Sequence, residues 1–400
     1  MNVLKKLYCR LYQTAFRLIL PLLPYREPQR LSKIEDIADI LQEKGVKKAL
    51  LVTDKGMRSL GVTAPLEADL RKHGIALAVY DEVCPNPTTG NVEAALFRYN
   101  MAGCQAILAF GGGSPMDCAK GVGARVARPK KSLGQLAGLL KVRRKMPPFI
   151  AIPTTAGTGS EVTLAAVITD VSQKHKYVIN AFALIPHYAV LDPKLTVSLP
   201  PHLTATTGMD ALTHAVEAYI GGSTTKYTRQ MAEQAVNRIF TYLPRAYETP
   251  NDLVAREQML LASHWAGIAF TRSYVGYVHA LAHALGGEYN TPHGLANAML
   301  LPHVLATYGK SVHKKLQRLA LVAGIAAPTD TPKIAAEKFI SAIVKMNESF
   351  QIPATLPALR AEDTLRLATH AEKEANPLYP VPRLMTAKQL AKIYQNIIES

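Results

Sequence analysis

The chain has 400 residues, of which 48% are hydrophobic and 19% are charged. This length predicts two or three domains with a full hydrophobic core, and it excludes a small protein held together by disulfides. The contents of 25 Gly and 26 Pro are close to average, which excludes disorder or a collagen-like repeat as the main organisation.

The positive charge of the chain is gathered in two segments. The 46 Lys and Arg residues outnumber the 30 Asp and Glu residues, which leaves a net charge of +16. Residues 1–30 contain six basic residues and one acidic residue, and residues 125–145 contain eight basic residues and no acidic one. The rest of the chain is close to neutral, which argues against a nucleic-acid-binding surface spread over the protein. We expect residues 125–145 to form an exposed connection between a helix and the next strand.

The cysteines are widely spaced and form no CxxC pair; they are Cys9, Cys84, Cys104 and Cys118. A chain of this length does not need disulfides for stability. We therefore expect a reducing compartment and a cytoplasmic protein.

An amphipathic helix is predicted at the N-terminus. Apolar residues recur every three or four positions, at Leu4, Leu7, Leu11, Ala15, Leu18 and Leu22. Basic residues occupy other positions, and the helix is expected to end near Pro21. Arg10 and Arg17 interrupt the apolar stretch, so neither a transmembrane helix nor a signal peptide fits.

Two interpretations of this helix are open. It packs on the rest of the protein or on a second subunit, or residues 1–25 make a peripheral contact with an anionic membrane surface.

From residue 31 onward, short apolar runs alternate with helical patterns. Helices are expected around Lys33 to Lys44 and between the successive runs, and the strand candidates are Ala49–Val52, Ile75–Val79, Ala106–Phe110, Phe149–Ile152, Val162–Thr169 and Ala189–Leu191. Such alternation is typical of βαβ units around a buried parallel sheet. After Leu199-Pro200-Pro201, long stretches of helical period replace the β-branched runs.

The chain is therefore expected to hold an α/β dinucleotide-binding domain with a Rossmann-like parallel sheet and an all-α metal-binding domain. The predicted divisions are a basic N-terminal extension over residues 1–30, the α/β domain over 31–200 and the helical domain over 201–400. A ligand site is expected between the two domains.

A glycine-rich turn after one strand candidate is suited to a phosphate. Gly111, Gly112 and Gly113 follow Phe110, and Ser114 is the expected N-cap of the next helix. Glycines let the backbone approach a ligand closely, and the free amides of a helix start attract a phosphate. A tight turn without a ligand would show the same sequence, because this is neither a GxGxxG nor a Walker motif.

Two further features support a dinucleotide. The stretch from Thr154 to Ser160 is a second strand-terminal loop rich in hydroxyls and glycines. Asp54 follows the first strand of the domain, where its carboxylate would accept hydrogen bonds from ribose hydroxyls and repel a 2′-phosphate. This position favours NAD over NADP.

Polar residues in the helical half have the spacing of metal ligands. Asp210 and His214 lie at i and i+4, as do His279 and His283, and His293 follows on a turn. Each pair shares one helix face. A single histidine of this kind is more often a satisfied core or surface residue, but the set favours an ion such as Fe(II) or Zn(II), between which these ligands do not select.

At these residues the chain resembles the iron-containing (group III) metal-dependent alcohol dehydrogenases. The matching stretches are Gly111-Gly112-Gly113-Ser114-Pro115-x-Asp117, Pro153 to Glu161, Gly208-x-Asp210-Ala-x-x-His214, and His279-x3-His283-x2-Gly286-x5-Pro292-His293-Gly294. The resemblance runs from about residue 45 to the C-terminus. It implies a dehydroquinate synthase-like architecture and a homodimer.

The resemblance also implies the roles of individual residues. The metal ligands would be Asp210, His214, His279 and His293, while His283 would face the nicotinamide and substrate region. The implied cofactor contacts are Asp54, Asn86, Gly112, Gly113, Ser114, Thr154, Thr155, Thr158, Thr163 and Lys176. The chain departs from the family at its start, where the basic helix and Tyr25 to Pro28 replace the usual first strand and glycine turn.

The expected activity is an NAD-dependent interconversion of a primary alcohol and its aldehyde by hydride transfer, assisted by Fe(II) or Zn(II). His283 is the expected proton relay. Ala165, Ala166, Phe270 and Val275 predict an apolar and fairly roomy substrate pocket.

Alternatives within the family are a diol dehydrogenase and a hydroxyacid-oxoacid transhydrogenase. An alternative of another class is a membrane- or nucleic-acid-associated protein on an inactive dehydrogenase scaffold, but the intact ligand and cofactor motifs count against it. We expect a small alcohol or aldehyde as partner and no nucleic acid.

Overall fold

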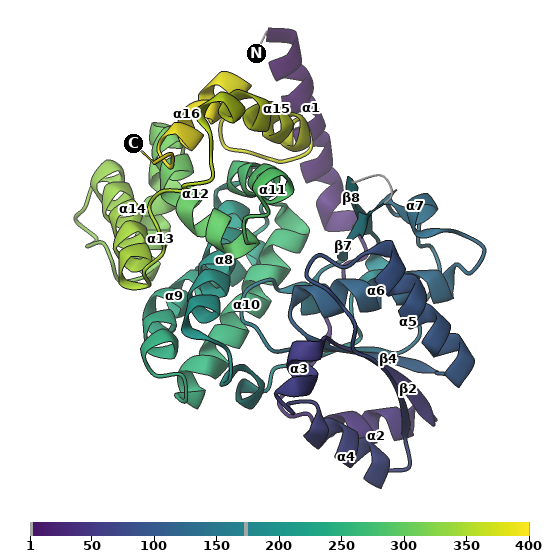
Figure 1. Cartoon of the computed structure of the whole chain (residues 1–400). Coiled ribbons are helices and arrows are strands. Elements are labelled where there is room, and N and C mark those ends of the chain that lie inside the picture. Colours follow the sequence, from purple (N-terminus) through teal and green to yellow (C-terminus); the bar gives the residue numbers. More distant parts are fainter. Residues whose placement is uncertain (1–2, 172–174, 400) are drawn as a thin grey trace. The chain divides into compact units, whose positions relative to one another are not determined.

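The computed structural model describes residues 3–171 and 175–399 (Figure 1). By its internal contacts the chain forms two compact units. One unit is Pro24–Ser198, and the other combines Met1–Leu23 with Leu199–Ser400.

The first unit contains a six-stranded parallel sheet of order β1-β9-β6-β4-β2-β3. Its strands are β1 (Gln29–Leu31), β2 (Lys48–Val52), β3 (Ala76–Tyr80), β4 (Ala106–Gly111), β6 (Phe149–Pro153) and β9 (Tyr188–Val190). Every residue of β4 and β6 is buried, because helices cover both faces of the sheet. The predicted Rossmann-like parallel sheet is confirmed.

Helices on the two faces build two separate cores. The helices of this unit are α2 (Asp36–Glu43), α3 (Lys55–Ser59), α4 (Ala64–Lys72), α5 (Thr89–Ala102), α6 (Gly113–Ala127) and α7 (Leu133–Leu136). Along β2, Leu50 and Val52 pack into one core with residues of α5 and α6, whereas Ala49 and Leu51 pack into the other with residues of α2 and α4. Figure 1 shows these helix pairs on opposite sides of the sheet. The alternation follows from the two-residue period of a strand.

A second sheet of this unit has the order β5-β8-β7, with β5 (Gly138–Leu139), β7 (Ala165–Asp170) and β8 (His175–Asn180). The expected strand Val162–Thr169 begins later than predicted, because residues Ser160–Val162 form a 3-10 turn. Sequence analysis did not predict β1, β5 or β8. Two of the three residues of β1 are polar, and its partner strand β9 is distant in the sequence.

The second unit is helical, as predicted. Its helices are α8 (Pro201–Ile220), α9 (Lys226–Glu248), α10 (Leu253–Ser273), α11 (Tyr277–Tyr289), α12 (His293–Tyr308), α13 (His313–Val322), α14 (Pro332–Ser349), α15 (Thr364–Ala375) and α16 (Ala387–Gln395). Helix α8 is the central element, since an unbroken buried run from Gly208 to Ile220 leaves it no solvent-facing side there. A helix that is buried on all sides is expected in the middle of a bundle.

The predicted N-terminal helix is α1 (Val3–Ile19), followed by the 3-10 turn η1 (Leu20–Leu22). It lies beside α15 (Figure 1) and is bonded to the C-terminal part of its own unit, where the Gln13 amide donates to the Tyr379 carbonyl over 2.7 Å. Within residues 3–171 and 175–399, no helix is both long and apolar enough to cross a membrane.

Candidate metal centre

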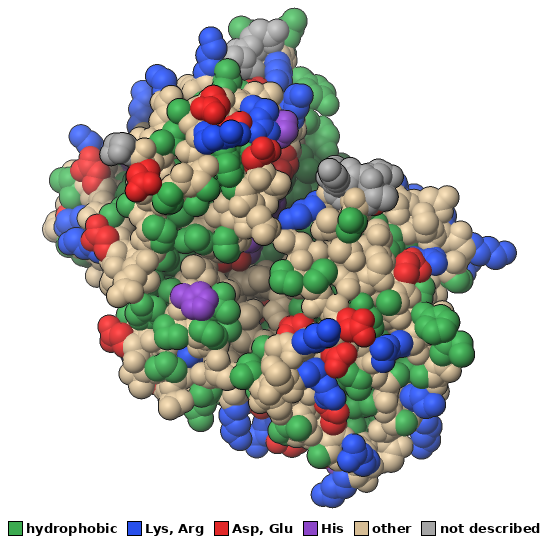
Figure 2. Space-filling model, viewed as in Figure 1, with side chains coloured by type: hydrophobic (Ala, Val, Ile, Leu, Met, Phe, Trp, Pro, Cys, Tyr) green, Lys and Arg blue, Asp and Glu red, His purple; other side chains and the backbone are tan. Residues whose placement is uncertain are grey.

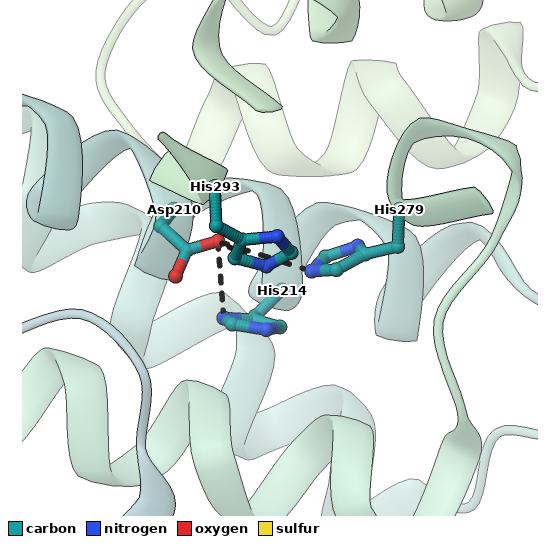
Figure 3. A group of neighbouring side chains, drawn as sticks. All are labelled: Asp210, His214, His279 and His293. Carbon is teal, nitrogen blue, oxygen red and sulfur yellow. Dashed lines mark ion pairs between the residues drawn. The ribbon is translucent and has the colours of Figure 1, made fainter. Parts of the chain in front are cut away.

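Three helices of the second unit bring four potential metal ligands together. Asp210 and His214 belong to α8, His279 belongs to α11, and His293 is the first residue of α12. One ligand atom from each lies within 4.8 Å of the others. Figure 3 shows the three imidazole rings gathered around one oxygen of the Asp210 carboxylate.

The helix spacing and one glycine explain this convergence. Asp210 and His214 share a face of α8 because they are four residues apart. A Cβ on Gly294 would lie 2.4 Å from the backbone oxygen of Thr206, so only glycine permits α12 to begin so close to α8. That close approach places His293 beside Asp210.

The distances within the cluster are longer than those of ordinary hydrogen bonds. Oδ1 of Asp210 lies 3.5 Å from Nε2 of His293, and 3.9 Å from both Nε2 of His279 and Nδ1 of His214. The ring of Phe270 stacks on His214 with centroids 4.1 Å apart. Phe270 thus forms an apolar cover for one ligand.

Glu217 orients His279. This carboxylate is 2% exposed and accepts hydrogen bonds of 2.7 Å from Nδ1 of His279 and from the backbone amides of Gly276 and Val278. With its proton on Nδ1, the imidazole presents an unprotonated Nε2 to the cluster. Burial raises the pKa of Glu217 to about 7 against the opposing effect of these hydrogen bonds.

Asn297 contacts two other members of the cluster, Asp210 and His293. Its Nδ2 donates to Oδ1 of Asp210 over 2.7 Å and lies 3.1 Å from Nε2 of His293. The side chain is fully buried, one helical turn after His293. Sequence analysis missed Asn297 and the role of Glu217, although each lies one turn beyond a predicted ligand on the same helix.

The donor set, with three buried members and an exposed His293, fits a divalent metal. Nε2 of His279 is buried and has no hydrogen-bond partner, and burial lowers the pKa of His279 well below its ordinary value. An unsatisfied buried polar atom is costly and needs an explanation. A cation held by one carboxylate and three neutral imidazoles provides one, and Fe(II) and Zn(II) both suit this set.

His283 stands beside this cluster. Its ring stacks on His293 with centroids 5.2 Å apart, and its side chain is 44% exposed. Nδ1 of His283 is bonded to Glu374 over 2.7 Å, and Glu374 also accepts from the Tyr379 hydroxyl over 2.7 Å. The imidazole is therefore held by a carboxylate while part of it reaches solvent.

The expected phosphate-binding turn begins α6 in the other unit. Gly112, rather than Ser114, is the N-cap, so the prediction for Ser114 was wrong. Gly112 adopts extended backbone and α6 starts at Gly113, which makes the glycine turn itself the helix start. The Ser114 hydroxyl instead accepts a hydrogen bond of 3.3 Å from the backbone amide of Asn86.

Other expected cofactor residues join this turn. The Lys176 amine donates to the Asn86 side chain over 3.0 Å. A Cβ on Gly112 would lie 3.4 Å from the Thr155 methyl, and one on Gly113 would lie 3.2 Å from the Thr158 methyl. The two predicted loops are thus in contact.

Asp54 caps the short helix α3. Its Oδ1 accepts a 3.0 Å hydrogen bond from the backbone amide of Met57, and the side chain is only partly buried. Capping occupies one oxygen, and Oδ2 has further acceptor capacity.

Sequence analysis missed Lys120, which connects α6 to the second loop. Its buried amine donates to the hydroxyls of Ser160 and Thr163 over 3.0 and 2.7 Å, and to the carbonyl of Ala165 over 2.9 Å. Thr154 in this loop and Thr163 shortly after it are both buried. Ala166 is fully buried in the hydrophobic core, so its expected place in a substrate pocket was wrong, because it occupies the inward face of β7.

Two family models match the chain over separate ranges. The model described as "Iron-containing alcohol dehydrogenase" matches residues 29–193, and the model described as "Fe-containing alcohol dehydrogenase family, C-terminal" matches residues 204–398.

Individual relatives match over nearly their whole length. The chain is 40% identical over 385 residues to a 1,3-propanediol dehydrogenase of Klebsiella pneumoniae, covering 95% of this chain and 98% of that protein. It is 34% identical over 367 residues to an NAD-dependent methanol dehydrogenase of Bacillus methanolicus, covering 91% and 96%. A solved structure of 1,3-propanediol oxidoreductase matches with a TM-score of 0.90 and 39% identity, covering 93% of this chain and 98% of that one.

Proposed function

The chain belongs to the iron-containing alcohol dehydrogenase family, and we propose that it interconverts a small primary alcohol and its aldehyde with NAD and a divalent metal. It is an oxidoreductase that acts on CH–OH groups. The observation that carries the proposal is the cluster of Asp210, His214, His279 and His293, in which a buried imidazole nitrogen lacks a hydrogen-bond partner.

These four residues would hold the metal. When bound, a divalent cation acts as a Lewis acid toward the oxygen of an alcohol or carbonyl. Fe(II) and Zn(II) are both proposed, because a ligand set without a thiolate does not select between them. Glu217 holds the ring of His279 with Nε2 toward the cluster, and Asn297 donates a hydrogen bond to the Asp210 carboxylate.

The proposed NAD contacts lie around the start of α6. The free amides of Gly113 and Ser114 at this helix start would bind the pyrophosphate, with Thr154, Thr155 and Thr158 on the adjacent loop. The second oxygen of Asp54 would accept from a ribose hydroxyl, and its charge would exclude a 2′-phosphate, which supports NAD over NADP. Bound NAD supplies a nicotinamide carbon that accepts a hydride from the alcohol carbon.

Lys176 and Asn86 would contact the same cofactor. Their mutual hydrogen bond keeps the Lys176 amine at the turn, where its charge attracts an anionic dinucleotide. Thr163 would take part through its hydroxyl, which Lys120 holds in place.

His283 is the proposed proton relay. Oxidation of an alcohol releases one hydride and one proton, and the proton has to reach water. A partly exposed imidazole beside the ligand set can accept it and pass it on. Glu374 would stabilise the charged imidazolium. Burial acts to raise the pKa of Glu374, but the charge of His283 and the hydrogen bonds from His283 and Tyr379 outweigh this effect. The pKa of Glu374 is therefore below its ordinary value.

The names of the relatives support a short primary alcohol or diol as the substrate, because they include 1,3-propanediol and methanol dehydrogenases. Phe270 supplies an apolar surface at His214. We also propose a homodimer that works in the cytoplasm. A hydroxyacid-oxoacid transhydrogenase of the same family is the alternative reaction.

The test is a substrate screen with the full chain. Purified protein is loaded with Fe(II) or Zn(II), and NADH formation is measured with methanol, 1-propanol, 1,3-propanediol and a 2-hydroxy acid. Alcohol-dependent NADH formation that vanishes on chelation supports the proposal. Hydroxy-acid oxidation coupled to an oxo acid without NADH release would favour the transhydrogenase, and absence of both NAD binding and metal binding would favour an inactive scaffold.

A further inference from the structure

Helix α1 packs against its unit through its polar side. Its buried residues are Cys9 and Gln13, and the Gln13 amide donates to the carbonyls of Tyr379 and Pro377 over 2.7 and 3.3 Å. Arg10, one turn earlier, donates to the carbonyl of Val381 over 2.8 Å. These bonds fix the rotation of the helix about its axis.

Contacts at other turns of α1 agree with this orientation. The Lys5 amine pairs with Glu372 over 2.9 Å, and the ring of Phe16 meets Tyr274 edge-on with centroids 5.1 Å apart. The helix is therefore attached along its length rather than at one end.

The apolar side of α1 is consequently exposed. Its large exposed side chains are Val3 (80%), Leu4 (76%), Leu7 (55%), Tyr8 (59%), Leu11 (62%), Leu18 (71%) and Ile19 (51%). Soluble proteins seldom expose a continuous apolar band of this kind unless it binds something. An ordinary surface helix turns such a band toward its own core, and α1 does the reverse.

Positive charge borders this apolar band. At 100° per residue, Lys6 and Arg17 lie along one edge of the exposed band. Lys5 lies along the other edge and is paired with Glu372. Residues 3–26 contain no acidic residue. In Figure 2, blue and green side chains occur together where α1 emerges at the top of the view.

We propose that α1 is a docking surface for anionic phospholipid, and that it holds the enzyme at a membrane surface. An apolar band bordered by lysine and arginine matches acyl chains below and acidic headgroups beside the helix. A second copy fits less well, because pairing two such helices would bring the charges of Lys6 and Arg17 from both copies together, and residues 3–26 contain no acidic residue to compensate them. Tyrosines near the band suit the boundary between headgroups and acyl chains.

The length of α1 and its place in the chain agree with this role. Its 17 residues extend for about 25 Å and would lie in the plane of the interface rather than cross it. The family model that covers the first unit begins at residue 29, so α1 lies outside the matched region. Dehydrogenase chemistry therefore does not account for the exposed band.

The proposal is tested by co-sedimentation of the full chain with vesicles. One set contains phosphatidylcholine alone, and the other contains phosphatidylcholine and phosphatidylglycerol in a two-to-one ratio. We expect binding to the anionic vesicles at least about ten-fold stronger than to the neutral ones, and a loss of binding in high salt. Equal binding to both sets, or no binding to the anionic set, would overturn the proposal.

Two double variants separate the apolar and electrostatic contributions. Leu7→Gln with Leu11→Gln keeps helix propensity but removes two members of the band, and should weaken binding by about ten-fold or more. Lys6→Gln with Arg17→Gln should weaken binding to anionic vesicles by roughly ten-fold. Binding that is unchanged in the leucine variant contradicts the proposal.

The matched control removes exposed apolar residues from another helix of the same unit. Ile334→Gln with Val344→Gln on α14 changes side chains of 44% and 38% exposure and should leave vesicle binding as it is. Light scattering tests the rival occupant, a second copy of the chain. If the wild type does not bind vesicles and the leucine variant has half the molecular mass of the wild type, the band joins two copies. Dehydrogenase activity reports folding, since none of these residues belongs to the proposed catalytic machinery.

Discussion

The carboxylate of Glu217 holds Nδ1 of His279 at 2.7 Å, and the opposite nitrogen of the same ring, Nε2, is buried without a hydrogen-bond partner. The two facts are connected, because a proton kept on Nδ1 leaves a lone pair on Nε2. Glu217 comes from α8 and His279 from α11, so the packing of these two helices determines which nitrogen of His279 carries the proton.

Glu217→Gln should therefore weaken metal binding by roughly 10- to 100-fold. Glutamine has one acceptor oxygen in place of two, whereas the native carboxylate accepts from three N–H groups. Metal affinity is measured by titration of the apo protein against a competing chelator. Unchanged affinity in a folded variant would contradict the role given to Glu217.

Lys120→Met should weaken NAD binding by roughly ten-fold, because it removes three hydrogen bonds that hold the second cofactor loop. Metal content should stay as in the wild type, since the ligands belong to the other unit. Calorimetric titration with NAD and metal analysis check the two parts. A variant that binds NAD normally would remove Lys120 from the cofactor site.

The pKa of Lys120 predicts that the stability of the folded protein depends on pH, and the same substitution tests this. Burial lowers the pKa of Lys120 to about 8, below its ordinary value of 10.5. Between these pH values the unfolded chain binds more protons than the folded one, so this group makes the folded state more stable as pH rises. The Tm of the wild type minus that of Lys120→Met should increase by a few degrees from pH 7 to pH 9.5. A constant difference would contradict the lowered pKa.

Asp54→Ala should reduce kcat/KM with NAD by roughly ten-fold and improve use of NADP, because it removes a charged hydrogen-bond acceptor and the repulsion of a 2′-phosphate. The partial control is Asp54→Asn, which keeps the cap of α3 but not the charge. Loss of activity in the alanine variant alone, with the asparagine variant unchanged, would show that only the cap matters.

His283→Ala should retain the metal while kcat falls roughly 100-fold or more. Imidazole added to the buffer should restore part of the rate, since the side chain of His283 is partly exposed. Loss of metal from this variant would make His283 a ligand, and a normal rate would exclude it as the proton relay.

Much of the fold could be predicted from the sequence because its signals are local. Runs such as Ala106–Phe110 are apolar throughout, which indicates a strand buried on both faces. In contrast, β1 is three residues long and pairs with β9, which lies far along the chain. Arg26, just before β1, donates to the carbonyls of Pro186 and Ile185 in the same distant region. No periodicity could indicate that pairing.

The proximity of Asp210 and His214 could be predicted for the same reason, since residues four positions apart share a helix face. Supporting residues were harder to find. Glu217 acts on His279 across 62 positions, and Lys120 acts on Thr163 across 43. Such contacts depend on how helices and loops pack, and the sequence pattern specifies only the face on which each residue lies.

The rotation of α1 could not be predicted either. Its periodicity indicated an apolar side, and ordinary packing would have buried it. Polar bonds from Arg10 and Gln13 to backbone carbonyls instead select the opposite rotation. Backbone acceptors of this kind carry no signal in the sequence.

The central claim is that Asp210, His214, His279 and His293 hold a metal on which NAD-linked alcohol oxidation depends. The most direct test is metal analysis by mass spectrometry on the wild type and His279→Ala, both reconstituted with Fe(II) or Zn(II), alongside NADH formation from a primary alcohol. We predict one metal ion per chain with activity in the wild type, and loss of both in the folded variant. A His279→Ala protein that keeps its metal and its full activity would contradict the account.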